Sequence, residues 1–157
     1  MNAKINIRKA TSGDFEALAR VHHLAIHQGA TAYTMEQRRA WSPAQKTADE
    51  MAQRLNGQSV FLGETEENDL MGFLTLANGG YVDFAYILPR YRGAGLFRAL
   101  LSRVEMEARL NWLPRLHTHA SLHARPAFAA MGFQVIRPET ISIGQVWLPR
   151  FAMEKRL

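Results

Sequence analysis

The stretch from Gly80 to Leu101 constrains the fold of this chain more than any other part of the sequence. It begins with an apolar run that is rich in β-forming residues and stops at Pro89. A loop with two glycines follows at residues 92–95, and after it apolar residues recur at the spacing of a helix. This order predicts a strand, a phosphate-type loop and a helix in direct succession.

The glycines of this loop favour an anion site. The first amides of a helix have no partner inside the helix, and the macrodipole places partial positive charge there. Gly93 and Gly95 carry no Cβ that would keep a diphosphate away from those amides, and Arg90, Arg92 and Arg98 add charge nearby. A Gly-x-Gly turn before a helix is also ordinary turn chemistry, so the loop by itself leaves both interpretations open.

The length and composition are those of a single globular domain that covers residues 1–157. The chain has no cysteine, which excludes a disulfide framework, a thiolate nucleophile and a cysteine-based zinc site. No apolar run approaches the roughly 20 residues needed to cross a bilayer, and the start of the chain lacks the apolar core of a signal peptide. We therefore expect a cytoplasmic protein with no membrane partner.

Charge is unevenly distributed along the chain, whose net charge is +5. Residues 1–88 contain eight Lys/Arg and ten Asp/Glu, whereas residues 89–157 contain eleven and four. A basic half can bind nucleic acid, but these arginines are scattered singly and form no cluster. A small polyanionic cofactor accounts for the asymmetry equally well, and nucleic acid is the less favoured partner.

Alternation, helical spacing and capping residues predict the remaining elements. Thr34 and Gln37 have the spacing of a capping box, Gly132 is suited to end a helix, and Pro149 places the last strand at an edge or a bulge. The expected strands are 4–10, 59–65, 70–76, 80–88, 116–120, 133–136 and 146–153. The expected helices are 11–29, 34–41, 46–55, 95–110 and 122–131. This series implies one α/β sheet with helices on both faces.

The loop after the central strand resembles the signature of the GNAT superfamily of N-acetyltransferases, Arg/Gln-x-x-Gly-x-Gly/Ala. Arg92 and Gly95 match this pattern, and Phe97 stands where the last small residue is usual. The order of the predicted elements is also that of the GNAT fold. The resemblance therefore covers nearly the whole chain.

A second segment is similar to the part of GNAT enzymes that carries Asn-x-x-Ala and, further on, Tyr-x-x-x-Gly-Phe. Ala124, Gly132 and Phe133 are retained here. Ser121 stands at the Asn position and Phe128 at the Tyr position. Apart from the resemblance, these apolar residues fit the packed face of a helix.

The resemblance implies a GNAT-type mixed, mostly antiparallel central sheet with helices on both faces. It also implies transfer of the acetyl group of acetyl-CoA to an amine, on a small molecule or a peptide. In that fold the strands ending at Leu88 and Ala120 diverge, and the pantetheine arm pairs with backbone groups between them. The residues implied for the cofactor are Ile87, Leu88, Arg92, Gly93, Ala94, Gly95, Leu96, Phe97, Arg98, Ser121 and Arg125.

An amine that attacks a thioester directly needs no enzyme nucleophile, but it needs a base that keeps it neutral. By period two, Tyr81, Asp83, Ala85 and Ile87 are expected to share one face of the central strand. The catalytic Glu of some relatives falls on Tyr81, and Asp83 lies two residues further along. A carboxylate in an apolar strand is either used in a site or paired within the structure, and both roles stay open for Asp83.

The departing thiolate also takes up a proton, and the family's usual donor is the tyrosine that Phe128 replaces. His119, Ser121 and Tyr86 are the candidate donors in this sequence. Water is a further source, because thiols are acidic enough to need little help. Of the candidate catalytic residues Asp83, His119 and Tyr86, we expect the loss of Asp83 to be more damaging than the loss of His119.

The acceptor pocket is expected, by the same resemblance, to be lined by Tyr33, Trp41 and Tyr81. Aromatic residues at these positions also fit an ordinary core. The acidic balance of residues 1–88 favours a cationic amine.

A metal site is a competing interpretation. His117 and His119 alternate on a predicted strand with His123 nearby, and His23 and His27 lie four residues apart on a predicted helix. Neither set has a carboxylate at a familiar spacing, so no metal is expected.

A binding module is the other alternative. The departures at Phe97 and Phe128 fit a domain of the same fold that binds acyl-CoA without turnover, or nucleic acid through its basic half. Exposed edge strands make a homodimer possible.

Overall fold

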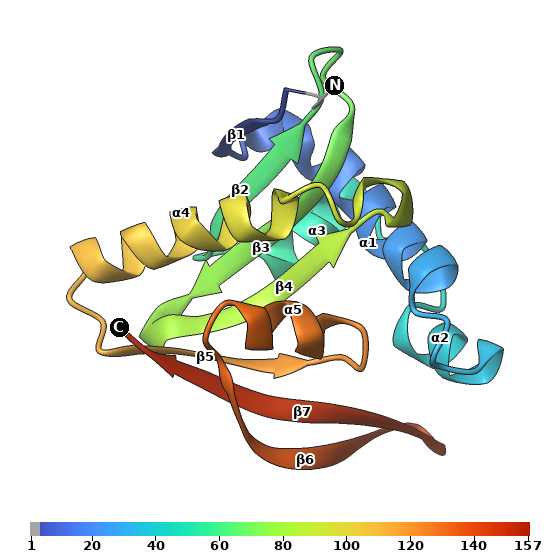
Figure 1. The fold of residues 1–157 in the computed structure, drawn as a ribbon. Helices are drawn as coiled ribbons and strands as arrows, with labels where there is room; N and C mark the ends of the chain where they lie inside the picture. The colour runs from blue at the N-terminus through green and yellow to red at the C-terminus, as the bar shows by residue number, and fades with distance from the viewer. Residues whose placement is uncertain (1–3) are drawn as a thin grey trace.

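The structure, a computed structural model, describes residues 4–157 as one seven-stranded sheet with helices on both faces (Figure 1). The strands are β1 (Asn6–Lys9), β2 (Ser59–Glu64), β3 (Leu70–Ala77), β4 (Tyr81–Ile87), β5 (Arg115–Ala120), β6 (Gln134–Ile143) and β7 (Val146–Arg156). The helices are α1 (Phe15–Gly29), α2 (Met35–Trp41), α3 (Ala48–Arg54), α4 (Leu96–Leu110) and α5 (Ala124–Ala130). The strand order is β1-β2-β3-β4-β5-β7-β6, with β4 and β5 parallel and the five other pairings antiparallel.

Two large hydrophobic cores hold α1, α3, α4 and α5 on the sheet, and a smaller cluster around Tyr33 and Leu148 packs against Trp41 of α2. In Figure 1, α4 and α5 lie in front of the sheet, and α1 and α3 lie behind it. The core under α1 and α3 buries Leu18, Met51 and Phe73, and the core under α4 and α5 buries Leu100 and Phe128. Each of these side chains stabilises the fold by roughly 1.5–3 kcal/mol relative to exposure. The expected mixed, mostly antiparallel sheet with helices on both faces is confirmed.

Local capping decides where the short helices begin. The Thr34 hydroxyl accepts a hydrogen bond from the Gln37 amide at 3.1 Å, and the Gln37 side chain accepts one from the Thr34 amide at 2.8 Å. Thr47 and Glu50 form the same reciprocal pair at the start of α3. Gly132, with φ of +94°, follows α5. The capping box predicted at Thr34 and the helix end at Gly132 are confirmed.

A β-bulge interrupts β4 in the middle of the sheet. On β3 one residue, Thr75, lies between the partners of Val82 and Ala85, so Asp83 and Phe84 both stand opposite it. The Thr75 hydroxyl accepts a hydrogen bond from the Phe84 amide at 2.9 Å. This bond satisfies a buried N–H that the disrupted ladder would otherwise leave without a partner.

The bulge changes which side chains of β4 share a face. The predicted single face of Tyr81, Asp83, Ala85 and Ile87 is wrong. Tyr81 and Asp83 line a cavity on the α3 side, whereas Ala85 and Ile87 pack with the core under α4. The extra residue shifts the two-residue alternation by one position, so Tyr86 joins Tyr81 and Asp83 on the α3 side.

β4 and β5 diverge towards their C-terminal ends. Their parallel pairing consists of Tyr81 with His117 and Val82 with Thr118. Beyond Val82 the two strands separate, which confirms the divergence that the resemblance implied. The gap opens at the end of β4 that leads into the glycine loop.

β7 lies inside the sheet, between β5 and β6, and β6 forms the edge. Pro149 predicted an edge or a bulge for β7, and of these the edge position is wrong for the strand as a whole. β6 extends to Ile143 instead of Ile136. The pairing of β5 with β7 reaches only to Phe151, so Pro149 lies beyond the end of β5. On that open side the Pro149 carbonyl accepts a hydrogen bond from the Tyr33 hydroxyl at 2.6 Å. No strand of residues 4–157 pairs with β7 there, so the lack of an N–H on proline leaves no ladder hydrogen bond unmade.

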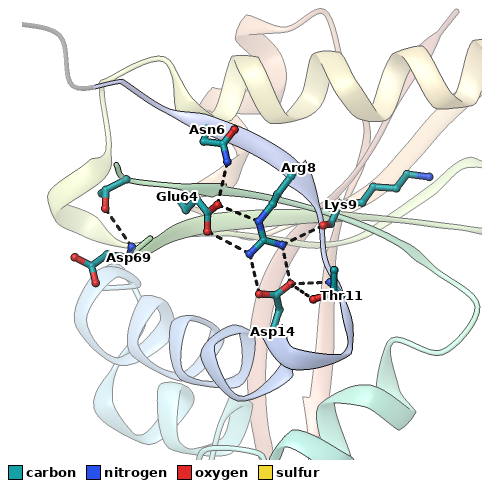
Figure 2. A network of polar contacts seen from close by, with 8 residues as sticks. Asn6, Arg8, Lys9, Thr11, Asp14, Glu64 and Asp69 are labelled. Carbon is teal, nitrogen blue, oxygen red and sulfur yellow. Dashed lines mark hydrogen bonds and ion pairs between the residues drawn. The ribbon is translucent and has the colours of Figure 1, made fainter. Parts of the chain in front are cut away.

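Arg8 connects β1 to β2 and to the start of α1 through two carboxylates (Figure 2). Its guanidinium donates to Asp14 at 2.8 and 2.9 Å and to Glu64 at 3.0 and 3.2 Å. The hydrogen bonds from Arg8 lower the pKa of Asp14 from 3.8 to about 2 and also lower the pKa of Glu64. This network fixes the first strand to the sheet.

We expect acid to destabilise the protein through Asp14. A carboxylate whose folded pKa lies below its unfolded pKa stabilises the protein above the unfolded value of 3.8, and this contribution is lost as the pH falls towards about 2. The loss is on the order of 1–2 kcal/mol after allowance for solvent screening. Urea unfolding at about pH 5 and about pH 2.5 measures it as a difference in free energy of unfolding.

The Asp14→Asn variant should lose less stability between the two pH values than the wild type. Asp69→Asn is the matched control, because the backbone amide of Asp69, and not its carboxylate, is hydrogen-bonded in this region (Figure 2). Equal acid losses in the wild type and Asp14→Asn would contradict the assignment.

Candidate active site

The loop between β4 and α4 presents backbone amides at the N-terminus of α4. Gly93 and Gly95 have φ of +79° and +81°, which L side chains rarely adopt, and a Cβ built on either would meet nothing within 4 Å. Within residues 4–157, no hydrogen bond is donated by the amides of residues 93–98. The positive end of the α4 dipole adds to these free donors. This open cradle can hold a diphosphate.

Two of the residues that depart from the family pattern, Phe97 and Phe128, contact each other. The rings of Phe97 and Phe128 meet edge to face with their centroids 5.0 Å apart, and Phe128 also packs against Phe133 at 4.9 Å. Phe128 is 1% exposed, so it is a core residue. The buried Phe128 ring thus stands at the position of the family's usual tyrosine, and it has no proton to donate. A proton donor must come from another residue or from water.

A first cavity, of about 440 Å³, opens between the glycine loop, the end of β4 and the start of α5. Its wall also includes Ala25 and Ile26 of α1 and His123. The predicted cofactor residues on its wall are Ile87, Arg92, Gly93, Gly95, Leu96, Phe97, Arg98 and Ser121. Arg125 instead lies over the Phe151 ring at 4.6 Å, and Ala94 is exposed on the loop.

Both backbone groups of Leu88, one of the residues predicted to contact the cofactor, are hydrogen-bonded within the protein. Its amide donates to the Met71 carbonyl at 3.0 Å, and its carbonyl accepts from the Tyr91 amide at 3.0 Å. Neighbouring residues of an antiparallel strand point their backbone groups to opposite sides, so those of Ile87 face the gap between β4 and β5. Ile87 is therefore the residue placed to pair with an extended ligand in the gap.

Arg92 connects the loop to α1. Its guanidinium donates to the Gly29 carbonyl at 3.2 Å, at the C-terminal end of α1 where the dipole favours a cation. A Cβ at Gly29 would contact the Arg92 guanidinium, so a side chain there would force this flexible group to shift. The remaining N–H groups of Arg92 are available at the cavity wall.

A second cavity, of about 310 Å³, lies on the α3 side of β4 and meets the first. Trp41, Tyr86 and Ser121 belong to both walls and mark the junction of the two cavities. The residues predicted for the acceptor pocket, Tyr33, Trp41 and Tyr81, all line the second cavity.

Asp83 lies on the wall of the second cavity and accepts three hydrogen bonds. Arg54 donates two of them in a bidentate pair, at 2.6 and 3.1 Å, and the Gln58 side chain donates the third at 2.7 Å. The Arg54 guanidinium also lies 4.8 Å from the centroid of the Phe84 ring. The carboxylate is thus held in a fixed position at the cavity wall, and its partner comes from the last turn of α3.

Three titratable side chains around the second cavity favour their neutral forms. Burial raises the pKa of Tyr86 above its usual value of 10, and it lowers the pKa of His119 below 6.5. Burial, with the charge of Lys46, lowers the pKa of His22 to about 4. At neutral pH Tyr86 can therefore donate a hydrogen bond, and both histidines can accept a proton.

The sequence analysis missed several residues of the second cavity: His22, Lys46, Arg54 and Arg150. His22 has the spacing of the buried face of α1 and is 5% exposed, but its Nδ1 has no hydrogen-bond partner within residues 4–157. The three basic residues come from different parts of the chain. They carry no local signal, because only the fold brings them together.

The histidines considered for a metal do not form a site with three ligands. His23 and His27 lie side by side, with ring centroids 4.3 Å apart, and each is hydrogen-bonded to Ser42. His117 and His119 lie against the Tyr81 ring at 5.2 and 5.6 Å, whereas His123 accepts a hydrogen bond from the Ala32 amide at 2.8 Å. Across residues 4–157 no three His, Asp or Glu side chains are grouped as metal ligands. In the same range, no helix combines the length and apolarity needed to cross a membrane.

The diverging strands, the free amides and the two joined cavities define a class of transferase that receives an extended, phosphate-bearing co-substrate beside a separate acceptor. Comparison with known sequences identifies the family within this class. Residues 29–157 match the acetyltransferase (GNAT) domain, and the chain belongs to this family of N-acetyltransferases.

Relatives span the whole chain. It is 26% identical over 151 residues to the uncharacterized N-acetyltransferase YafP of Escherichia coli K12, covering 95% of this chain and 94% of YafP. A GCN5-related N-acetyltransferase structure from Rhodopseudomonas palustris, titled Aminotransferase, Class-II, has a TM-score of 0.91 and 27% identity, over 100% of this chain and 98% of that one. The PaiA N-acetyltransferase of Thermoplasma acidophilum, solved with coenzyme A, shares the fold with a TM-score of 0.76 at 18% identity, over 98% and 99%.

Proposed function

We propose that this protein transfers the acetyl group of acetyl-CoA to the amine of a small molecule or a peptide by direct attack. The observation that carries the proposal is the junction at Trp41, Tyr86 and Ser121, where a cavity with free backbone amides meets a second, polar cavity. The Thermoplasma relative, solved with coenzyme A, supports the choice of co-substrate.

The residues of the first cavity fit this co-substrate. The free amides of residues 93–98 would bind the diphosphate, with Arg92 and Arg98 at the wall adding positive charge. The backbone of Ile87 would pair with the pantetheine amides in the gap between β4 and β5. Acetyl-CoA would supply an activated thioester, and this binding mode would bring it to the junction.

Residues at the junction and beside it would have separate roles in the reaction. A backbone amide facing the gap, near Ile87, would donate to the thioester carbonyl oxygen, on which negative charge develops during attack. Asp83 would take the proton from the ammonium, directly or through one water, and free the nitrogen lone pair. Tyr86 stays protonated and would donate a hydrogen bond to the departing sulfur. As the C–S bond breaks, the attacking nitrogen would release its second proton, which passes through water to the thiolate and gives free coenzyme A and the acetylated amine.

His119, predicted as a candidate proton donor, fits the role of a second base better. Its lowered pKa keeps it neutral, and its Nδ1 lies 3.4 Å from the Glu139 carboxylate. It lines only the second cavity, whereas Tyr86 lines both and so lies at their junction. We therefore assign it a smaller role than Asp83.

The test is an assay of coenzyme A release from acetyl-CoA with a panel of monoamines, polyamines, amino acids and peptides. We expect release with at least one class of acceptor, together with a product that has gained one acetyl group by mass spectrometry. Thermal stabilisation by acetyl-CoA without release from any amine would favour a binding domain instead. Affinity for DNA or RNA with steep salt dependence would favour nucleic-acid binding.

A further inference from the structure

The wall of the second cavity carries more positive than negative charge. Its basic residues are Lys46, Arg54 and Arg150, and Asp83 is the carboxylate among its lining residues. Arg54 and Asp83 neutralise each other in their bidentate pair. The two other cations therefore determine the charge that an acceptor meets.

Lys46 is the less compensated of these two cations. It is half-buried between α2 and α3, and no carboxylate of residues 4–157 lies within ion-pair distance of its ammonium. Its charge acts on His22, which lines the same cavity. The charge of Lys46 also acts on the exposed carboxylate of Glu50, but the two form no ion pair, so an anion in the cavity would not have to displace one.

Arg150 is only loosely paired. Its two hydrogen bonds to Glu139 measure 3.3 and 3.4 Å, longer than a good charge-assisted bond. Glu139 is shared with Arg137, whose guanidinium lies 3.2 Å from the other carboxylate oxygen. Arg150 therefore keeps donors that an anion in the cavity can use.

We propose that the acceptor is a small amine that also carries an acidic group, and that Lys46 and Arg150 bind this acid. The amine then points to the junction at Tyr86 and Ser121, where the thioester arrives. This assignment rests on the proposed acetyl transfer and names its substrate class. A carboxylate and a phosphonate share the required chemistry, a delocalised anion that accepts several hydrogen bonds.

A polyamine or another purely cationic acceptor fits this cavity poorly. A second positive charge would face Lys46 and Arg150 in a partly buried space, where like charges repel strongly. The acidic balance of residues 1–88 does not set the charge of the cavity, because among the described residues of that half the carboxylate on its wall is Asp83, which Arg54 neutralises. The volume of about 310 Å³ suits a small molecule.

Matched acceptors test the proposal directly. Each amino acid is assayed beside its own amide and its decarboxylated amine, and aminoalkyl phosphonates are assayed beside the carboxylates of equal length. We expect kcat/KM for the acid to exceed that of its amide by at least about tenfold, since a hydrogen-bonded ion pair is lost. The phosphonate arm shows which anion the cavity prefers.

The variant Lys46→Gln should lower kcat/KM for the acids by about tenfold, through KM, and leave the amides within about twofold. Lys46→Arg should keep most of the activity with acids. Lys4→Gln is the matched control, because Lys4 is an exposed lysine outside both cavity walls.

The outcomes separate the two proposals. Acetyl transfer that favours amides, monoamines or polyamines over acids, or an equal loss for acids and amides in Lys46→Gln, overturns the acidic acceptor and leaves acetyl transfer in place. Failure of every amine to release coenzyme A overturns acetyl transfer and the acceptor class with it. A preference for acids that disappears in Lys46→Gln supports both.

Discussion

Replacing Gly93 and Gly95 together by alanine should weaken acetyl-CoA binding by about a hundredfold or more. The two methyl groups would occupy open space in which a diphosphate must approach the amides at the start of α4. A hydrogen bond to a charged group contributes roughly 1.5–3 kcal/mol, so the loss of two corresponds to at least about two orders of magnitude in Kd. Isothermal titration calorimetry with acetyl-CoA measures the effect directly.

The control for this experiment is the double alanine variant of Gly57 and Gly79. These glycines have φ of +81° and +76°, and a Cβ on either also meets nothing within 4 Å. They match Gly93 and Gly95 in backbone strain, but they lie outside both cavity walls. Similar losses of acetyl-CoA affinity in the two double variants would show that strain, and not the blocked amides, is responsible.

Replacing Asp83 by asparagine should lower kcat/KM about a hundredfold while leaving the Kd of acetyl-CoA unchanged. General base catalysis contributes about two to four orders of magnitude, and the amide of asparagine cannot accept the ammonium proton. The change also leaves the positive charge of Arg54 without its counter-ion beside the incoming ammonium. Steady-state kinetics with the best acceptor measures the change in kcat/KM, and calorimetry measures whether the Kd of acetyl-CoA stays the same.

Two further variants define the role of Asp83. His119→Gln should cost less than about tenfold, because His119 borders the second cavity only. Arg54→Gln keeps the carboxylate and removes its bidentate partner, so it should cost less than Asp83→Asn. If Arg54→Gln proved as damaging as Asp83→Asn, Asp83 would act by positioning Arg54 and not as the base.

The parts of the fold that depend on neighbours in sequence were predictable. The glycine loop follows from residues 92–95, since positive φ and free helix-terminal amides are local properties. The capping pair of Thr34 and Gln37 likewise needs no distant partner. The same holds for the helix end at Gly132. These predictions required only the chemistry of a few adjacent residues.

The predictions for the shared face of β4 and for the edge position of β7 were wrong, because both depend on pairing between strands that are distant in the sequence. The bulge at Asp83 and Phe84 depends on the register of β4 against Thr75 of β3, and it reverses the face that simple alternation assigns. The position of β7 depends on its pairing with both β5 and β6, which Pro149 tolerates because β5 has already ended. Neither feature has a counterpart in the local pattern.

The sequence by itself determined the order of the elements, the glycine loop before α4 and membership of an acetyltransferase family. These properties reside in residues close together in the chain, and conformational preferences and hydrogen bonds over three or four residues are sufficient to specify them. Tertiary structure alone decided that Asp83 lies with Tyr86, that Leu88 is already bonded, and that Lys46 and Arg150 line one cavity. Charges from separate elements become a binding site only when the packing of the sheet and its helices brings them to the same wall.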